Sequence, residues 1–171
     1  METLKQETTE CCPVFHPEKW DEKSFEWRNK QFIKGSVPTF FHIPYPSMIG
    51  KQISSLTKIA EDANKLDSNR ENILVLFADP HPFKSEIFMS VTGEVPDAKN
   101  ITLTGNFMSK VFDGAYNDIP KFIKQMNDIL NEKRLKASKY YVHYGYCPKC
   151  AEVAGHNYMV LFAEIEKIKS I

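Results

Sequence analysis

The four cysteines are the residues whose type and spacing most directly suggest chemistry. Cys147 and Cys150 form a Cys-x-x-Cys motif, and Cys11 and Cys12 are adjacent near the N-terminus. A Cys-x-x-Cys turn lets two thiolates converge on one ion, and Zn²⁺ prefers about four nitrogen or sulfur ligands in a tetrahedron. Because successive side chains in extended backbone point in opposite directions, the sequence predicts a zinc site formed by Cys147, Cys150 and one of the N-terminal pair.

His16 and His156 are the candidates that could complete this zinc site. A closed set of four ligands would make the site structural, whereas an open position would activate water. Two other interpretations of the same cysteines stay open. The thiols could form a reversible disulfide, although the element order of a thioredoxin-like protein is not visible. They could also be thiols without a chemical role.

Two glutamates form a second candidate group. Glu164 shares a face of an expected strand with Phe162 and Tyr158, and Glu86 shares a face of another with Phe88. A carboxylate among aromatic rings attracts a cation. Burial would raise its pKa and suit it to general acid–base catalysis. In the competing interpretation both glutamates lie in water at strand ends, as most glutamates do.

Aromatic side chains are expected to form the walls of a ligand pocket. The candidate wall residues, with one histidine from a stiff loop, are Trp20, Trp27, Tyr116, Tyr144, Tyr158 and His81. Both tryptophans lie within residues 11–36, a segment rich in proline and aromatic residues. Burying each ring is worth about 2–3 kcal/mol. The segment is therefore expected to pack on the main domain as an arm, either as a simple cover or as part of the pocket wall.

The hydrophobic pattern of the rest of the chain predicts an α+β fold. Apolar residues at a helical period indicate two helices, one after Ser47 and one after Asp118. Alternating or continuous apolar runs indicate strands. The expected strands span residues 37–43, 73–78, 86–92, 101–112, 140–146 and 157–166.

This order of elements is strand–helix–strand–strand, near residues 37–92 and again near 101–166. Two such copies are expected to join into one curved antiparallel sheet with both helices on one face. The duplication would create a cleft between two similar halves, which is a common place for a ligand. Residues 1–36 are then a tail and packing arm, and residues 37–171 form the domain.

Composition narrows the classes of function. The 171 residues fit one domain. The 22 basic and 22 acidic residues cancel, whereas a dedicated nucleic-acid binder would carry a basic excess. The longest apolar run, Ile73–Ala78, is too short to cross a bilayer. Met1–Glu10 lacks the apolar core of a signal peptide. We expect a cytoplasmic protein that binds neither nucleic acid nor membrane, and nothing in the sequence indicates its oligomeric state.

Short motifs carry a resemblance to known families. Gly114-Ala115-Tyr116 before a helix resembles a signature of the gyrase-inhibitor-like (GyrI-like) small-molecule-binding superfamily. The N-terminal pattern Cys-Cys-Pro-x-Phe-x-Pro-x-x-Trp resembles that of an uncharacterised bacterial group usually called hydrolases. Cys-Pro-x-Cys-Ala and Gly-x-Asn-Tyr near the C-terminus also resemble this group. The likeness covers about residues 10–165.

The resemblance implies a duplicated fold with a cleft lined by aromatic residues, often with an acidic residue that meets cationic ligands. Some members of the superfamily hydrolyse reactive compounds with pocket glutamates. The leading hypothesis is therefore a protein that binds a partly apolar molecule, able to carry positive charge, in an aromatic and acidic cleft. One alternative is a small hydrolase of reactive electrophiles that uses Glu164 or Glu86. Another is a metal-binding or redox stress protein centred on the cysteines.

Overall fold

The structure is a computed structural model that describes residues 12–41, 43–44, 46–81 and 83–169, with only the backbone described at 43, 44, 46, 80 and 81. Its strands are β1 (Lys23–Phe40), β2 (Ile43–Pro44), β3 (Val75–His81), β4 (Lys84–Ser90), β5 (Asn100–Asp113), β6 (Leu135–Tyr144) and β7 (Tyr158–Lys167). Its α-helices are α1 (Pro46–Asp62), α2 (Ile119–Glu132) and α3 (Pro148–Ala154). Three short 3₁₀ helices span Pro17–Lys19, Arg70–Asn72 and Tyr116–Asp118.

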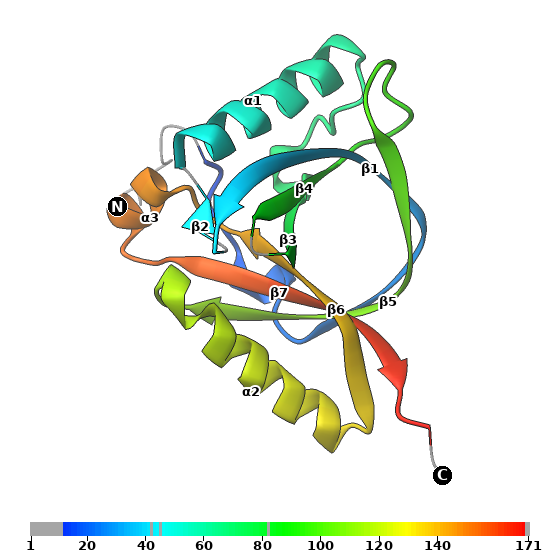
Figure 1. The fold of residues 1–171 in the computed structure, drawn as a ribbon, viewed down its shortest axis with the longest axis vertical. Helices are drawn as coiled ribbons and strands as arrows, with labels where there is room; N and C mark the ends of the chain where they lie inside the picture. The colour runs from blue at the N-terminus through cyan, green and yellow to red at the C-terminus, as the bar shows by residue number, and fades with distance from the viewer. Residues whose placement is uncertain (1–11, 42, 45, 82, 170–171) are drawn as a thin grey trace, which may run out of the picture.

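The strands form one antiparallel sheet in the order β2-β1-β4-β3-β6-β7-β5. Because β5 also pairs with β1, the sheet closes into a barrel-like ring with β2 attached outside it (Figure 1). The α+β class and the curved antiparallel sheet are therefore confirmed. The sheet curves so strongly that its strands β1 and β5 pair with each other.

Both long helices cover the outer face of this sheet (Figure 1). Leu56 and Ala60 of α1 are buried in one core with residues of β1 and β4. Met126 and Leu130 of α2 are buried in another core with residues of β7. Each helix buries one apolar stripe, as its periodicity predicts. Among the described residues, no helix combines the length and the apolar character needed to span a bilayer.

The interior of the ring holds a third core made mainly of aromatic side chains. It contains Trp27, Phe32, Phe88, Phe107, Tyr141 and Phe162, with Phe15, Trp20 and Phe25 packed against it. The N-terminal aromatic residues thus pack on the inner face of the sheet, opposite the helices. These aromatic side chains thus form a packed core inside the barrel-like sheet.

The stretch expected to be an irregular arm is largely strand. Residues 23–36 belong to β1, which pairs with β5 from Lys23 to Ile33 and with β4 from Phe32 to Pro38. A bulge lies between Trp27 and Lys30, and Asn29 there has φ of 52°. A bulge bends a strand and shifts its side chains to the other face. The apolar residues of β1 therefore do not alternate, which is why the pattern did not show a strand.

The two halves of the chain have the same order of elements, β1-α1-β3-β4 and β5-α2-β6-β7, if β2 and α3 are set aside. Their pairings also correspond: in each half the first and second strands pair with the third. The halves join through their first strands, β1 with β5, and through their second strands, β3 with β6. The expected element order is present, and an origin by duplication stays a prediction.

Candidate functional site

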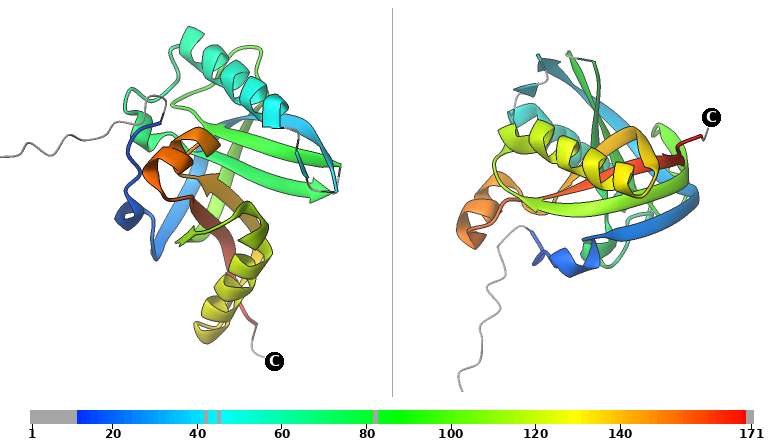
Figure 2. Two further views of the ribbon diagram at one scale, coloured as in Figure 1. Left: turned by 90° about the vertical axis from the view of Figure 1, so that its left-hand side faces the viewer. Right: turned by 90° about the horizontal axis from the view of Figure 1, so that it is seen from below.

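A cleft of about 1560 Å³ opens between α1 and the start of α2 and reaches the N-terminal aromatic residues on the inner side of the sheet. Its floor comes from β3 and β6, where the two halves meet, and residues of the N-terminal segment 12–20 form one wall. Figure 2 (left) shows α3 between the two long helices on this side of the molecule. Apolar side chains line much of the cleft, including Ile49, Ile53, Val75, Phe77, Ile119, Ile123 and Val142.

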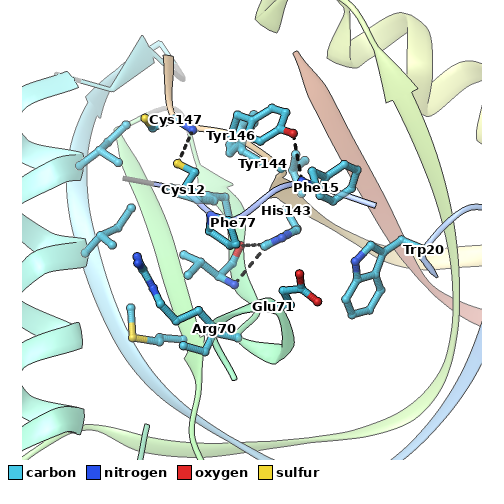
Figure 3. A pocket seen from close by; sticks show the side chains of 18 of the residues that line it. Cys12, Phe15, Trp20, Arg70, Glu71, Phe77, His143, Tyr144, Tyr146 and Cys147 are labelled. Carbon is cyan, nitrogen blue, oxygen red and sulfur yellow. Dashed lines mark hydrogen bonds between the residues drawn. The ribbon is translucent and has the colours of Figure 1, made fainter. Parts of the chain in front are cut away.

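The floor contains a histidine that fills a gap in the sheet. The register joins β3 to β6 through Phe77 and Val142, and near Val75 the side chain of His143 replaces a strand partner. Its Nδ1 lies 3.1 Å from the Val75 oxygen and 3.3 Å from the Val75 nitrogen (Figure 3). Burial lowers the pKa of His143, against the opposing effect of the Val75 hydrogen bond. The neutral ring can donate from Nδ1 to the Val75 carbonyl, which leaves Nε2 as its basic nitrogen.

One corner of the cleft combines aromatic rings with a carboxylate. The ring of Tyr144 lies 5.1 Å from that of Phe77 and 5.5 Å from that of Tyr116, centroid to centroid. Burial raises the pKa of the Tyr144 phenol, and the nearby charge of Asp79 raises it further. Asp79 is exposed to solvent. A carboxylate near the Tyr144 ring, which contacts the Tyr116 ring, can stabilise a bound cation together with these rings by charge and by cation–π contact.

The N-terminal wall is held by contacts with the C-terminal half. The Phe15 N–H donates to the Tyr146 hydroxyl at 3.0 Å, and the Trp20 ring lies 6.4 Å from that of His143. Glu71 reaches the same wall, with its Oε1 3.7 Å from His16 Nε2. Figure 3 shows Glu71, Trp20 and His143 at one end of the cleft. This end therefore carries both a basic nitrogen and a carboxylate.

Three of the four cysteines lie together at the rim of the cleft. The sulfur atoms of Cys12, Cys147 and Cys150 all lie within 4.8 Å of one another and could bind a metal ion. Cys12 and Cys147 line the cleft, whereas Cys150 is buried. Cys11 lies outside the described residues. The predicted convergence of the N-terminal cysteines with the Cys-x-x-Cys motif is thus observed for Cys12.

The aromatic residues predicted to line a pocket separate into two groups. Trp20, Tyr116 and Tyr144 line the cleft. Trp27 instead lies in the aromatic core inside the ring, 4.3 Å from Phe107 between ring centroids. Tyr158 stacks on His156 at 4.9 Å and contacts Phe15 at 5.1 Å. Tyr158 therefore packs against a residue of the N-terminal wall without lining the cleft itself.

The two glutamates predicted to be catalytic do not line the cleft. Glu86 is buried and forms an ion pair with Lys34 across β4 and β1. Burial acts to raise its pKa, but the hydrogen bond and charge of Lys34 outweigh this effect and the pKa lies below its ordinary value. Glu164 stands opposite Phe107 on β7, with its carboxylate close to Gly105. Neither glutamate is among the lining residues, although Lys139, which lines the cleft, lies near both.

The predicted histidines have other surroundings. His156 Nδ1 lies 2.7 Å from Asp113 Oδ2, and His16 lies between Glu18 and Glu71. Neither belongs to the cysteine cluster. The side chain of His81 is outside what the structure describes, although its backbone belongs to β3.

The cleft also contains residues that the sequence did not single out as functional. His143 lies within the expected strand 140–146, and Asp79 directly follows the expected strand 73–78. In the structure Asp79 instead lies within β3, two residues before its last residue, His81. The role of His143 depends on the spacing of β3 and β6, which no local pattern predicts.

No curated protein matches the chain. A family model described as bacterial hydrolase matches residues 2–165. This range includes the N-terminal wall, both long helices, the Cys-x-x-Cys motif and every strand that forms the floor of the cleft. The broader gyrase-inhibitor-like resemblance stays a prediction. Because the match covers nearly the whole sequence, the chain belongs to the bacterial hydrolase family.

Proposed function

We propose that this protein binds a partly apolar, positively charged small molecule in the cleft between α1 and α2. The observation that carries the proposal is the cleft itself, about 1560 Å³ in volume with a largely apolar lining. Pockets for small molecules combine such linings with a few placed polar groups. Here the placed group for a cation is Asp79, near Tyr144, whose ring contacts that of Tyr116.

Tetraphenylphosphonium and tetraphenylborate form a matched pair of probes for this proposal, because they share shape and apolar surface and differ in charge. Isothermal titration is expected to show tighter binding of the cation. Asp79→Asn is expected to weaken cation binding by about fivefold, since an exposed charge contact is worth about 1 kcal/mol. The same change should leave binding of the anion unchanged or improved.

Gly50 offers a way to block the cleft without disturbing the core. It lines the cleft, and a Cβ added there would have no atom within 4 Å. Gly50→Trp is expected to abolish binding of both probes, while Gly50→Ala, the matched control, retains it. Lack of binding by the unaltered protein, equal affinity for both ions, or full binding by Gly50→Trp would contradict the proposal.

A second candidate function is hydrolysis, which two observations favour. The chain belongs to a family described as bacterial hydrolase, and His143 lies in the cleft with Nδ1 held by the Val75 backbone. A histidine held in this way can take a proton from water through Nε2, so that the resulting hydroxide attacks an electrophilic carbon. We propose His143, rather than Glu164 or Glu86, as the general base of such a reaction.

His143→Asn tests this role because the asparagine amide can still donate to the Val75 carbonyl while the basic nitrogen is lost. Turnover of p-nitrophenyl acetate and butyrate is expected to fall by at least roughly 100-fold, the usual contribution of a general base. In the unaltered protein, the rate should rise with pH through a pKa below the ordinary 6.5 of histidine, because only the neutral ring accepts a proton. Unchanged turnover in the variant, or no turnover by the unaltered protein, would exclude this function for these esters.

A further inference from the structure

The cluster of Cys12, Cys147 and Cys150 is the feature that the cleft chemistry does not use. Their sulfur atoms lie within 4.8 Å of one another, although 135 residues separate Cys12 from Cys147 in the chain. Three sulfurs bound to Zn²⁺ at about 2.3 Å in a tetrahedron would be about 3.8 Å apart. Small side-chain rotations would therefore bring all three sulfurs onto one ion.

Local structure directs the three thiols toward a common point. Cys147 is extended and precedes α3, and Pro148 provides the fixed φ that starts the helix. Cys150 follows three residues later, so its side chain lies on the same side of the first turn. The Cys147 N–H donates to Cys12 Sγ at 3.5 Å. Hydrogen bonds of this kind orient thiolates in metal centres.

The presence of three sulfur atoms, rather than two, favours a metal centre over a disulfide. One disulfide would use two of the three cysteines and leave the third beside it, whereas one ion binds all three. Cys150 is only 2% exposed, while Cys12 and Cys147 line the cleft. The cluster thus has a buried side and an open side through which an ion can enter.

We propose that Cys12, Cys147 and Cys150 bind one Zn²⁺-class ion as thiolates at the rim of the cleft. Each thiol loses its proton to solvent when the ion binds. Cys11 lies outside the described residues and is not counted as a ligand. This proposal is independent of what the cleft binds.

The ion would fix the N-terminal wall of the cleft. The segment that begins at Cys12 supplies Phe15 and Trp20 to this wall, and the ion would tie its start to α3 in the C-terminal half. Removing the ion should loosen the wall. Lys19 is exposed in this segment, so trypsin should cleave after Lys19 faster when the ion is absent.

Cobalt and zinc titrations of the full chain test the proposal directly. The purified protein is stripped with a chelator in the presence of a reductant, and one equivalent of Co²⁺ is expected to produce thiolate-to-cobalt charge-transfer absorption. Zn²⁺ should displace the cobalt and slow tryptic cleavage after Lys19. Cys12→Ser, Cys147→Ser and Cys150→Ser should each lower zinc affinity by more than roughly 100-fold, the upper cost of losing an outer-shell partner.

Cys11→Ser is the matched control and should bind zinc as the unaltered chain does. Absence of the cobalt–thiolate absorption in the unaltered chain would overturn the proposal. An equal loss of affinity in Cys11→Ser and Cys12→Ser would overturn the assigned ligand set. If Cys150→Ser does not fold, the cobalt spectrum of the unaltered chain still decides, because its intensity reports the number of thiolates. Binding of tetraphenylphosphonium by the zinc-loaded protein is measured separately, so failure of the cleft proposal would not be mistaken for failure of this one.

Discussion

Glu86 shows how a residue with a chemically suggestive pattern can have a structural role. On the sequence it shares a strand face with an aromatic residue, which favours a pocket carboxylate. In the fold Lys34 lies diagonally across on the neighbouring strand, where Ser36 stands opposite Glu86. The side chains of Glu86 and Lys34 are only 10% and 20% exposed. Because cross-strand neighbours depend on pairing between distant segments, the partner that neutralises Glu86 could not be predicted from its own strand.

Glu86→Gln is therefore expected to affect stability and not the cleft. Loss of one partner from a buried ion pair leaves Lys34 uncompensated and should lower the free energy of unfolding by about 3 kcal/mol at neutral pH. Denaturant unfolding measures this loss. The double variant Lys34→Met with Glu86→Leu should recover most of it, and tetraphenylphosphonium binding should be unchanged in Glu86→Gln. Weakened probe binding with full stability would instead place Glu86 in the site.

The pH dependence of this stability has a definite sign. The folded pKa of Glu86 lies below its ordinary 4.5 because the effect of Lys34 outweighs that of burial. The stabilisation is therefore complete above about pH 4.5 and is lost as the pH falls through the lower, folded pKa. Glu86→Gln should remove this part of the acid dependence, so the difference in stability between the two proteins should shrink in acid.

At the scale of elements, what the sequence predicts depends on how regular each element is. Both long helices were predicted because each buries an unbroken apolar stripe, such as Ile49, Ile53 and Leu56 in α1. α3 was not predicted, because seven residues are too few to show a period. β1 was predicted only at its end, since the bulge after Trp27 interrupts its alternation.

The site residues were likewise predicted where the local pattern was regular, and were missed where their position depends on distant strands. Tyr116, from its place before an expected helix, and Tyr144 were both predicted as aromatic wall residues, and both line the cleft. The convergence of Cys12 with Cys147 and Cys150 was predicted from ligand chemistry. Trp27 was misplaced because its burial depends on ring closure by β5, which brings Phe107 against it. Local spacing thus indicates which residues could belong to a site. Pairing between distant strands then decides whether each side chain points into the cleft or into the core.

At the scale of the whole molecule, the two junctions between the halves differ. β1 and β5 pair along a ladder that includes Lys23–Trp27 and Lys30–Ile33. β3 and β6 share the register pair Phe77 and Val142, with His143 bonding the Val75 backbone beside it. The cleft lies over this second, weaker junction. A ligand seated there would contact both halves where, among the residues that the structure describes, the register pairs the fewest of their strand residues.

Hydrogen exchange with mass spectrometry should detect this difference. Segments with few ladder hydrogen bonds open at a lower free-energy cost. Peptides covering Val75–Phe77 and Val142–Tyr144 are therefore expected to exchange faster than peptides from the β1–β5 ladder. Tetraphenylphosphonium should slow exchange at the β3–β6 junction, because a ligand that binds only the closed form stabilises it by mass action. Gly50→Trp is the control, since it should abolish the ligand effect. Equal protection of the two junctions would mean that the side-chain bond of His143 and the packed helices hold the halves together as firmly as a full ladder does.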